Sequence, residues 1–182
     1  MTFDDITEDG RLWAVRYDGE EDNVLYSLFD QWNDVVWLRN FFKANSKDLE
    51  KYFKITNINQ AIARTIDDSE KLEAIVMDIS PEANLDLIFR PLNNSRIAEC
   101  VLGKEKARLK NLVGRNSWLR IYAIKLAKGA YIVTGGAIKL TVSMQEREHT
   151  AAELVKIEKV RNFLLNEKII DDDSFIEYIA EL

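Results

Sequence analysis

The sequence predicts a single α+β domain, spanning residues 1–182, in which a small antiparallel sheet packs against helices. Its 182 residues are 47% hydrophobic and 31% charged, which is typical of a globular domain that buries a core. Alternating apolar and polar residues, which indicate strands, occur near the N-terminus and between residues 117 and 141. Apolar residues at helical spacing fill much of the remaining chain.

The N-terminal part predicts a strand followed by a long helix. Apolar residues alternate around Trp13 and Val15, between two glycines, which predicts a strand over residues 11–17. From residue 23 to about residue 42, apolar residues recur every three or four positions, which predicts one amphipathic helix. Its apolar stripe consists of Leu25, Leu28, Phe29, Trp32, Val35 and Val36.

A helical insertion near residues 45–92 is expected next. Ser46 is the predicted N-cap of a short helix, and Asn57, followed three residues later by a glutamine, has the capping-box spacing that begins another. The polar run at 67–69 predicts a break in that helix. A further helix then continues until Pro81 ends it.

Two segments in the middle of the chain leave the type of structure open. Residues 85–92 are apolar but contain Pro91, so they suit either a helical turn or an edge strand. Residues 104–112 carry basic side chains at alternate positions, as a strand would, but their alanine and leucines suit a short helix. A turn is predicted at 114–116.

The strongest β signal is a hairpin with strands at 117–126 and 130–134, because aromatic and β-branched residues dominate both segments. Gly135 and Gly136 follow. They form either a second tight turn before a strand at 137–141, or part of one continuous strand whose backbone another group approaches closely. Both alternatives keep Lys139 near the sheet.

Two helices are predicted after the hairpin. Thr150 and Glu153 have the spacing of a capping box, and an apolar stripe follows them. The same arrangement at Ser174 and Glu177 predicts a short C-terminal helix. The stripe of the longer helix consists of Leu154, Ile157, Val160 and Leu164.

Charge is distributed unevenly along the chain, although the net charge is -6. Residues 1–100 hold 11 Lys and Arg against 20 Asp and Glu, and residues 150–182 hold 4 against 8. Residues 101–149 hold 10 against 3, a local excess of +7. Such an excess creates a positive surface for phosphate or for an acidic partner.

Several classes of function are excluded by what the sequence lacks. One cysteine and one histidine do not supply the ligands of an ordinary structural zinc site, and the acidic run at 171–173 suits a helix start better than a cation. There is no Walker A loop, G-x-G-x-x-G or G-x-S-x-G motif, so we expect no metal and no cofactor. No apolar run approaches the roughly 20 residues that a transmembrane helix needs, and no leader peptide is apparent, so we expect a cytoplasmic protein without membrane contact.

The basic segment contains the candidate functional residues. Alternation places Arg120 and Tyr122 on one face of their strand, where a cation beside an aromatic ring suits a phosphate and a stacked base. His149 is the default acid–base candidate, because histidine exchanges protons near neutral pH. The alternatives are a solvated sheet face with a tyrosine that caps the core, and a surface histidine.

The residues Trp118-Leu119-Arg120-Ile121-Tyr122, then Ala130-Tyr131-Ile132-Val133-Thr134-Gly135-Gly136-Ala137-Ile138-Lys139-Leu140-Thr141, then a helix, resemble the HigB/RelE-like toxins of bacterial toxin–antitoxin systems. The resemblance lies mainly in residues 117–165. In that superfamily an Arg-bearing strand leads into an apolar strand, a glycine, an apolar-Lys step and a polar loop. A strand, helices and then an antiparallel sheet is also that family's order.

The resemblance implies a metal-independent endoribonuclease that cleaves mRNA on the ribosome and is neutralised by an antitoxin protein. It implies that Arg120 and Lys139 bind phosphate, while Tyr122 or His149 transfers the proton of the 2′-hydroxyl. The other cations of the segment would extend the RNA contact: Lys104, Lys106, Arg108, Lys110, Arg115, Lys125 and Arg147.

A second hypothesis is a noncatalytic module on the same scaffold, derived from a phage or mobile element, that binds a nucleic acid or a protein. The length of the chain and its net acidity favour this alternative, because members of the superfamily are usually shorter and basic.

Overall fold

The computed structural model describes residues 1–77, 79, 83–92, 102–107, 117–127 and 129–181. Within this part, six strands form one sheet in the order β1-β2-β6-β5-β4-β3. The parallel pair is β2 with β6, and the other pairs are antiparallel. The expected α+β class is therefore confirmed. The strands are β1 (Thr2–Asp5), β2 (Leu12–Arg16), β3 (Phe89–Pro91), β4 (Gly103–Ala107), β5 (Leu119–Lys125) and β6 (Tyr131–Ile138).

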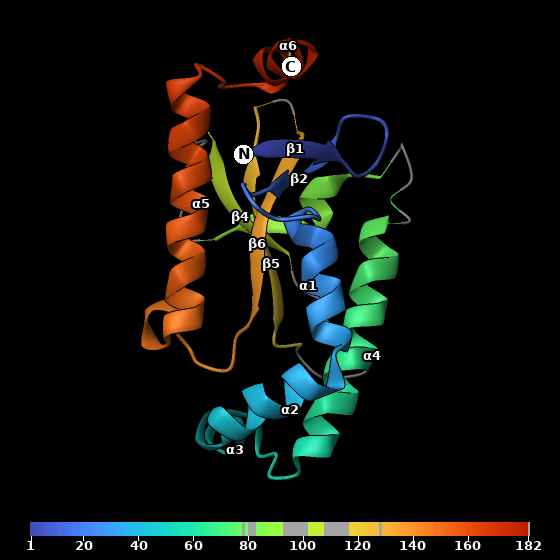
Figure 1. The fold of residues 1–182 in the computed structure, drawn as a ribbon, viewed down its shortest axis with the longest axis vertical. Coiled ribbons are helices and arrows are strands. Elements are labelled where there is room, and N and C mark those ends of the chain that lie inside the picture. Colours follow the sequence, from blue (N-terminus) through green and yellow to red (C-terminus); the bar gives the residue numbers. More distant parts are fainter. Residues whose placement is uncertain (78, 80–82, 93–101, 108–116, 128, 182) are drawn as a thin grey trace.

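Helices cover the sheet on both faces. Helices α1 and α4 lie on one face and α5 on the other, while α2 and α3 lie at one end of the molecule and α6 at the opposite end (Figure 1). The helices are α1 (Val24–Asn33), α2 (Val35–Ala44), α3 (Ser46–Phe53), α4 (Ile58–Met77), α5 (Glu148–Asn166) and α6 (Asp172–Ala180), with short 3-10 turns η1 (Leu85–Leu87) and η3 (Met144–Glu146). No helix in these described ranges is both long and apolar enough to cross a membrane.

The single helix expected at 23–42 is wrong, because Asp34 divides it. Asp34 has an extended backbone, and its carboxylate accepts hydrogen bonds from the amides of Val36 (2.8 Å) and Trp37 (3.1 Å). An aspartate N-cap satisfies the amides of a new helix and so allows α2 to leave in another direction. Val35 and Val36, which were expected in the buried stripe, are 44% and 70% exposed as a result.

The predicted break at residues 67–69 is also wrong, because α4 is continuous for 20 residues. Asp67 forms an i,i+4 ion pair with Lys71 at 2.7 Å, and the buried Ser69 accepts a hydrogen bond from Asn33 at 3.4 Å. These polar side chains are satisfied by neighbours and do not cap a new helix. The predicted start is confirmed, since the Asn57 side chain accepts from the amide of Asn59 at 2.9 Å.

The two ambiguous segments form short elements at the edge of the sheet. Residues 85–87 make a 3-10 turn, and Pro91 lies in the edge strand β3, where its missing amide costs no hydrogen bond. Residues 103–107 form β4 and not a helix. Residues 108–112 and the turn expected at 114–116 lie outside the described residues. Strand β1, which sequence patterns did not predict, pairs with β2.

The hairpin of β5 and β6 is confirmed, and the glycine pair lies inside β6. A Cβ atom at Gly135 would lie 1.9 Å from Oε2 of Glu153, and one at Gly136 would lie 2.6 Å from the carbonyl oxygen of Arg120. The continuous strand with a close approach is therefore the correct alternative. The separate strand expected at 137–141 does not form, since β6 ends at Ile138.

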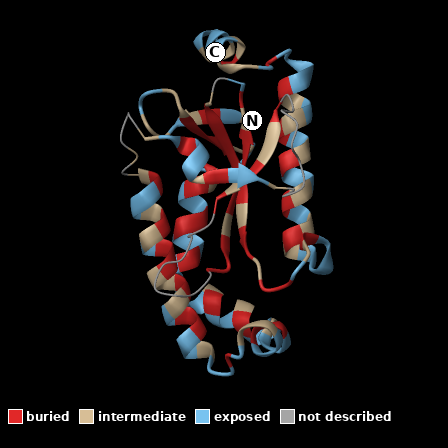
Figure 2. Cartoon of the chain, turned by 180° about the vertical axis from the view of Figure 1, so that it is seen from behind, coloured by how far each residue is buried: buried red, intermediate tan, exposed pale blue. Residues whose placement is uncertain are grey.

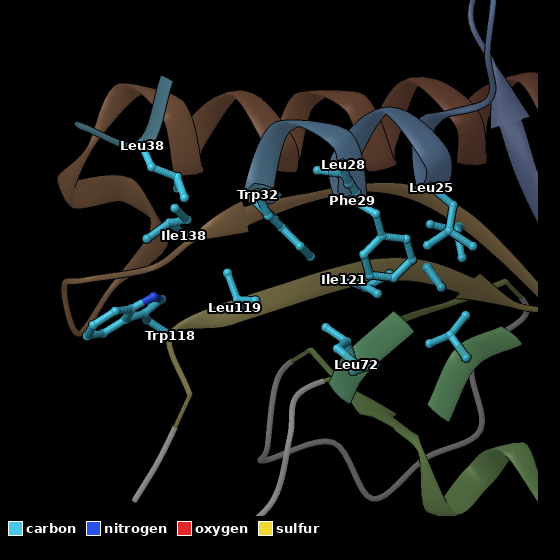
Figure 3. Packing of buried hydrophobic residues seen from close by; sticks show 14 of the residues in the cluster. Leu25, Leu28, Phe29, Trp32, Leu38, Leu72, Trp118, Leu119, Ile121 and Ile138 are labelled. Atoms are coloured by element: carbon cyan, nitrogen blue, oxygen red, sulfur yellow. The ribbon is translucent and has the colours of Figure 1, made fainter. Parts of the chain in front are cut away.

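Both faces of the sheet bury a hydrophobic core (Figure 2). On the α1 and α4 face, α1 directs Leu25, Phe29 and Trp32 at the strands (Figure 3). Trp118 lies at the edge of this core, and its indole N–H donates to the hydroxyl of Thr65 at 3.0 Å. On the α5 face, the core includes Phe3, Trp13, Tyr122, Ile157, Val160 and Phe175.

The C-terminal helices begin near their predicted starts. Helix α5 begins at Glu148, so Thr150 lies inside the helix and is not its N-cap. The hydroxyl of Thr150 donates to the carbonyls of Met144 and Arg147. Helix α6 is confirmed, but Asp171 is its N-cap and Ser174 is the capping-box partner. The acidic run therefore lies at a helix start, where acidic side chains favour the dipole.

We predict that Gly136→Ala lowers the free energy of unfolding by about 1–3 kcal/mol, because its Cβ would meet both a backbone oxygen and Leu28 Cδ1 at 2.7 Å. Urea denaturation of the wild type and the variant measures the difference. Val142→Ala, at a side chain that is 77% exposed, is the control and should change stability by less than about 0.5 kcal/mol. An unchanged or raised stability of Gly136→Ala would contradict the close contact.

Candidate functional site

Three predicted functional residues meet where β6 ends and α5 begins. Arg120 in β5 lies opposite Ala137, and the Lys139 amide donates to the Trp118 carbonyl at 2.8 Å, so Arg120 and Lys139 are diagonal neighbours on adjacent strands. His149 bonds through Nε2 to the carbonyl of Ile138, the residue before Lys139, at 3.0 Å. We call Arg120, Lys139, Arg147 and His149 the β6–α5 junction.

The two strand cations are half-buried and held by backbone carbonyls. Nη1 of Arg120 donates to the carbonyls of Ser117 (2.7 Å) and Leu119 (2.6 Å). Nζ of Lys139 donates to the carbonyl of Val142. These hydrogen bonds fix the positions of the two side chains.

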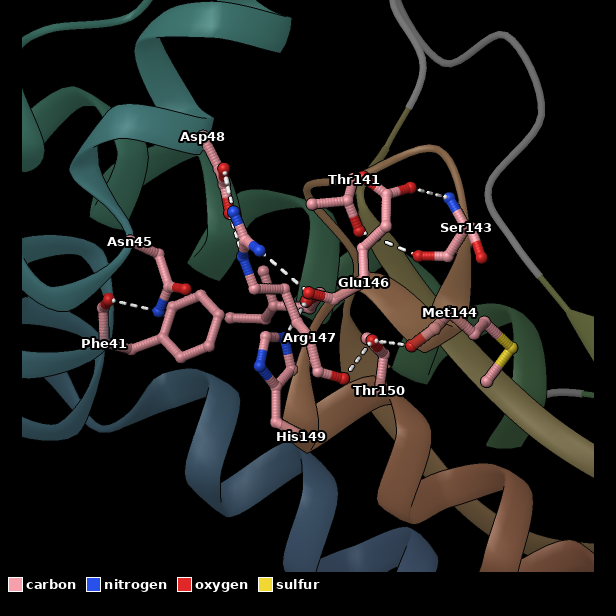
Figure 4. Close-up of polar contacts among 11 residues, drawn as sticks. Phe41, Asn45, Asp48, Thr141, Ser143, Met144, Glu146, Arg147, His149 and Thr150 are labelled. Atoms are coloured by element: carbon pink, nitrogen blue, oxygen red, sulfur yellow. Dashed lines mark hydrogen bonds and ion pairs between the residues drawn. The ribbon is translucent and has the colours of Figure 1, made fainter.

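His149 is fixed by two contacts that also set its protonation pattern. Its ring lies edge-on to Phe41, with centroids 5.2 Å apart, and Figure 4 shows it beside Arg147. A carbonyl oxygen only accepts hydrogen bonds, so the bond to Ile138 places a proton on Nε2. In the neutral ring, Nδ1 is then the nitrogen that accepts a proton.

Arg147 ties the start of α5 to α3. Its Nε and Nη2 atoms each donate to the carboxylate of Asp48 at 2.6 Å, a bidentate pair, and Asp48 is 6% exposed (Figure 4). The hydrogen bonds from Arg147 lower the pKa of Asp48. Arg147 is thus engaged in a structural ion pair, although its own side chain is 44% exposed.

The expectation that Arg120 and Tyr122 share an exposed surface is wrong. Tyr122 is 1% exposed because α5 covers this face of β5, and its hydroxyl has no hydrogen-bond partner among the described residues. Burial raises the pKa of Tyr122, so its proton is harder to remove than that of an exposed phenol. The alternation of side chains along β5 correctly placed Arg120 and Tyr122 on the same face, but it does not indicate which helix covers that face.

Glu153 is a site residue that sequence reasoning missed, since its spacing indicated only a capping role. Its carboxyl group is buried on Gly135, with 6% of the residue exposed. Oε1 accepts from Lys156 at 2.7 Å, whereas Oε2 has no hydrogen-bond partner among the described residues. Burial raises the pKa of this carboxyl group. Gly135 and Gly136 indicated that some group lies close to the backbone of this strand, but they did not identify the group as Glu153.

The other predicted RNA-binding cations that the structure describes have separate partners. Lys104 pairs with Glu158 of α5, whereas Lys125 pairs with Asp86 at 2.7 Å and faces the ring of Tyr131. Lys106 donates to the carbonyl of Leu92 at 3.0 Å. Three further candidates lie outside the described residues: Arg108, Lys110 and Arg115.

A buried acid lies beside the Lys125 and Asp86 pair. Glu105 is 7% exposed, and burial raises its pKa to about 7. The charge of Lys125 acts in the opposite direction and that of Asp86 in the same direction. Glu105 therefore carries its proton in the folded protein at pH values where an exposed glutamate is ionised.

We predict that Glu105→Gln removes a pH-dependent loss of stability. A carboxyl group whose pKa rises from 4.5 to about 7 on folding contributes stability that is fully present below 4.5 and is lost as the pH rises through about 7. Relative to the wild type, the glutamine variant should therefore gain about 3 kcal/mol between pH 4 and pH 8. Urea denaturation at a series of pH values measures this. A difference that does not vary with pH would contradict the prediction.

We predict that Asp48→Asn lowers the free energy of unfolding at pH 7 by about 1–2 kcal/mol, because it removes the charged partner of Arg147. Since Asp48 has a lowered pKa, this difference should shrink as the pH falls below 3.8. Thermal unfolding of both proteins measures it. Glu50→Gln, at an exposed residue of the same helix, should have little effect, and an equal loss in both variants would refute the pairing.

The junction thus collects Arg120, Lys139, Arg147 and His149, and leaves Tyr122 beneath α5. In the described part of the chain, no group of three or more His, Cys, Asp or Glu residues is arranged to hold a metal ion. The chain matches no protein-family model, no curated protein and no solved structure.

Proposed function

We propose that this protein is a toxin-like endoribonuclease of a bacterial toxin–antitoxin system, which cleaves mRNA without a metal ion at the β6–α5 junction. The observation that carries the proposal is that Arg120 and Lys139 are diagonal neighbours on adjacent strands, and that His149 bonds to the carbonyl of Ile138, the residue before Lys139. Two cations and a proton acceptor are the groups that cleavage by the 2′-hydroxyl requires. The resemblance of residues 117–165 to HigB/RelE-like toxins supports the same activity.

Each residue has a role in the proposed reaction. Nδ1 of His149 takes the proton of the 2′-hydroxyl as its oxygen attacks the adjacent phosphorus. Arg120 and Lys139 bind the phosphate and stabilise the negative charge that develops on its oxygens. The bond between phosphorus and the 5′-oxygen breaks, and the leaving oxygen takes a proton from water, so the products are a 2′,3′-cyclic phosphate and a 5′-hydroxyl.

The burial of Tyr122 favours His149 as the proton acceptor. Tyr122 lies beneath α5 and its pKa is raised, whereas His149 is half-buried at the end of the sheet. In this proposal, the antitoxin is a protein with an acidic segment that covers the positive charges of the junction. When no antitoxin is bound, the proposed partners of the protein are the ribosome and mRNA.

One observation favours the noncatalytic module as a second candidate function. Lys104, Lys125 and Arg147 are each already paired with an acidic residue of the chain. Fewer positive charges are then available to RNA than the sequence suggests, and an acidic protein becomes a comparable partner. Salt-sensitive binding without cleavage would favour this candidate.

We predict that the wild-type protein cleaves RNA in the presence of EDTA and arrests growth when expressed, and that Arg120→Ala or Lys139→Ala slows cleavage roughly 100-fold. The reason is the loss of one charge that stabilises the transition state. Single-turnover cleavage of a labelled RNA, with identification of the 2′,3′-cyclic phosphate end, measures the effect.

Lys43→Ala is the matched control, because Lys43 is an exposed cation of α2 outside the junction and should leave the rate unchanged. The proposal fails if wild-type expression leaves growth unaffected and purified protein leaves RNA intact on ribosomes. It also fails if cleavage persists unchanged in both the Arg120 and Lys139 variants.

A further inference from the structure

Two buried polar atoms beneath α5 lack a hydrogen bond of normal geometry in the described part of the chain. They are Oη of Tyr122 and Oε2 of Glu153, on residues that are 1% and 6% exposed. A buried polar group without a partner is costly, so such a pair calls for a functional or conformational explanation.

The position of Glu153 depends on a glycine. Gly135 lies opposite Tyr122 in the hairpin, and a Cβ at Gly135 would be 1.9 Å from Oε2 and 3.1 Å from Cδ of Glu153. The carboxyl group therefore occupies the space of the missing side chain. Any other residue at position 135 would place its Cβ atom where this carboxyl group lies, so the Glu153 side chain would have to move.

Glu153 is also coupled to the junction through α5. His149 lies four residues earlier, so both side chains project from the same side of the helix. His149 contacts the end of β6 through Ile138, and Glu153 contacts its middle through Gly135. Two contacts one helical turn apart fix both the position and the rotation of the first turns of α5.

We propose that Glu153 is a positioning residue of the β6–α5 junction: its carboxyl group, which lies against Gly135, holds the first turns of α5 against the sheet and thereby places His149. An effect of Glu153 on RNA cleavage rests on the proposed function, but the contact that holds α5 against the sheet does not.

The charged groups around Glu153 act in both directions. Burial raises its pKa, which favours the neutral form, while Lys156, the Gly136 amide and His149 favour the charged form. Tyr122 from β5 and Tyr17 after β2 face the same carboxyl group, and its charge would raise the pKa of both phenols. Arg120 acts on Tyr122 in the opposite direction. The pKa of Glu153 is raised on balance. The contact of its carboxyl group with Gly135, which we call the seat, is therefore more stable when Glu153 carries its proton.

A double-mutant cycle tests the seat itself, with amide hydrogen exchange as the measurement. Gly135→Ala should lower the protection of the Ala151 amide, which donates to Arg147 in the first turn of α5, by roughly tenfold or more. The Glu167 amide at the far end of α5 is the internal control and should change less. In a Glu153→Ala background, where the carboxyl group beside Gly135 is absent, the same Gly135→Ala change should lower the protection of Ala151 several-fold less.

Equal losses of Ala151 protection from Gly135→Ala in both backgrounds would overturn the proposal. So would equal losses at Ala151 and Glu167, because they would indicate general destabilisation.

Glu153→Gln tests the neutral form and retains the shape of the side chain. Because a raised carboxyl pKa contributes stability that is lost as the pH rises above 4.5, the wild type should lose more Ala151 protection with rising pH than the glutamine variant. The resonances of the only histidine, His149, should keep their wild-type positions in this variant. Glu158→Gln is the matched control, and its effect should have the opposite sign because Lys104 lowers the pKa of Glu158.

A glutamine variant that loses Ala151 protection with pH as the wild type does would also overturn the proposal. If Ala151 protection responds as expected but RNA is not cleaved, the proposed function fails and the positioning role remains. If RNA is cleaved but neither Gly135→Ala nor Glu153→Gln affects α5, the positioning role fails and the function remains.

Discussion

The middle of β6 is contacted so closely from both faces of the sheet that two consecutive residues have no space for a side chain. On one face, the carboxyl group of Glu153 from α5 lies against Gly135. On the other, Leu28 of α1 lies against Gly136. Since β6 is a central strand, paired with β2 and β5, helices from both faces of the sheet contact the same two glycines. The two hydrophobic cores lie on either side of this strand.

This packing determines where a ligand can be bound. With helices on both faces, the described sheet offers polar groups mainly where strands end, and the junction lies at such an end (Figure 1). Arg120 and Lys139 remain half-buried there, while Tyr122, only two residues from Arg120, lies beneath α5. On this face of β5, Arg120 is therefore half-buried whereas Tyr122 is buried. In the proposed function, this difference favours His149 over Tyr122 as the proton acceptor.

Local patterns predicted the elements whose causes are local. Side-chain chemistry and spacing identified the β5–β6 hairpin, the start of α4 at Asn57 and the presence of α6. They failed at Asp34 and at residues 67–69, because a short acid or serine within an apolar pattern either caps a helix or finds a partner inside one. Which occurs depends on distant groups such as Asn33 for Ser69. The pair of Asp48 with Arg147 joins residues 99 positions apart, and no local pattern reports it.

The proposed binding of RNA at the β6–α5 junction is tested most directly by the NMR resonances of His149, the one histidine in the sequence. The ligand is a short single-stranded RNA with 2′-O-methyl groups. It resists cleavage, because its 2′-oxygens cannot attack the phosphate. Adding that RNA should shift the His149 imidazole resonances in the wild type and much less in Arg120→Ala. Resonances of His149 that stay unchanged while RNA binds would contradict the account.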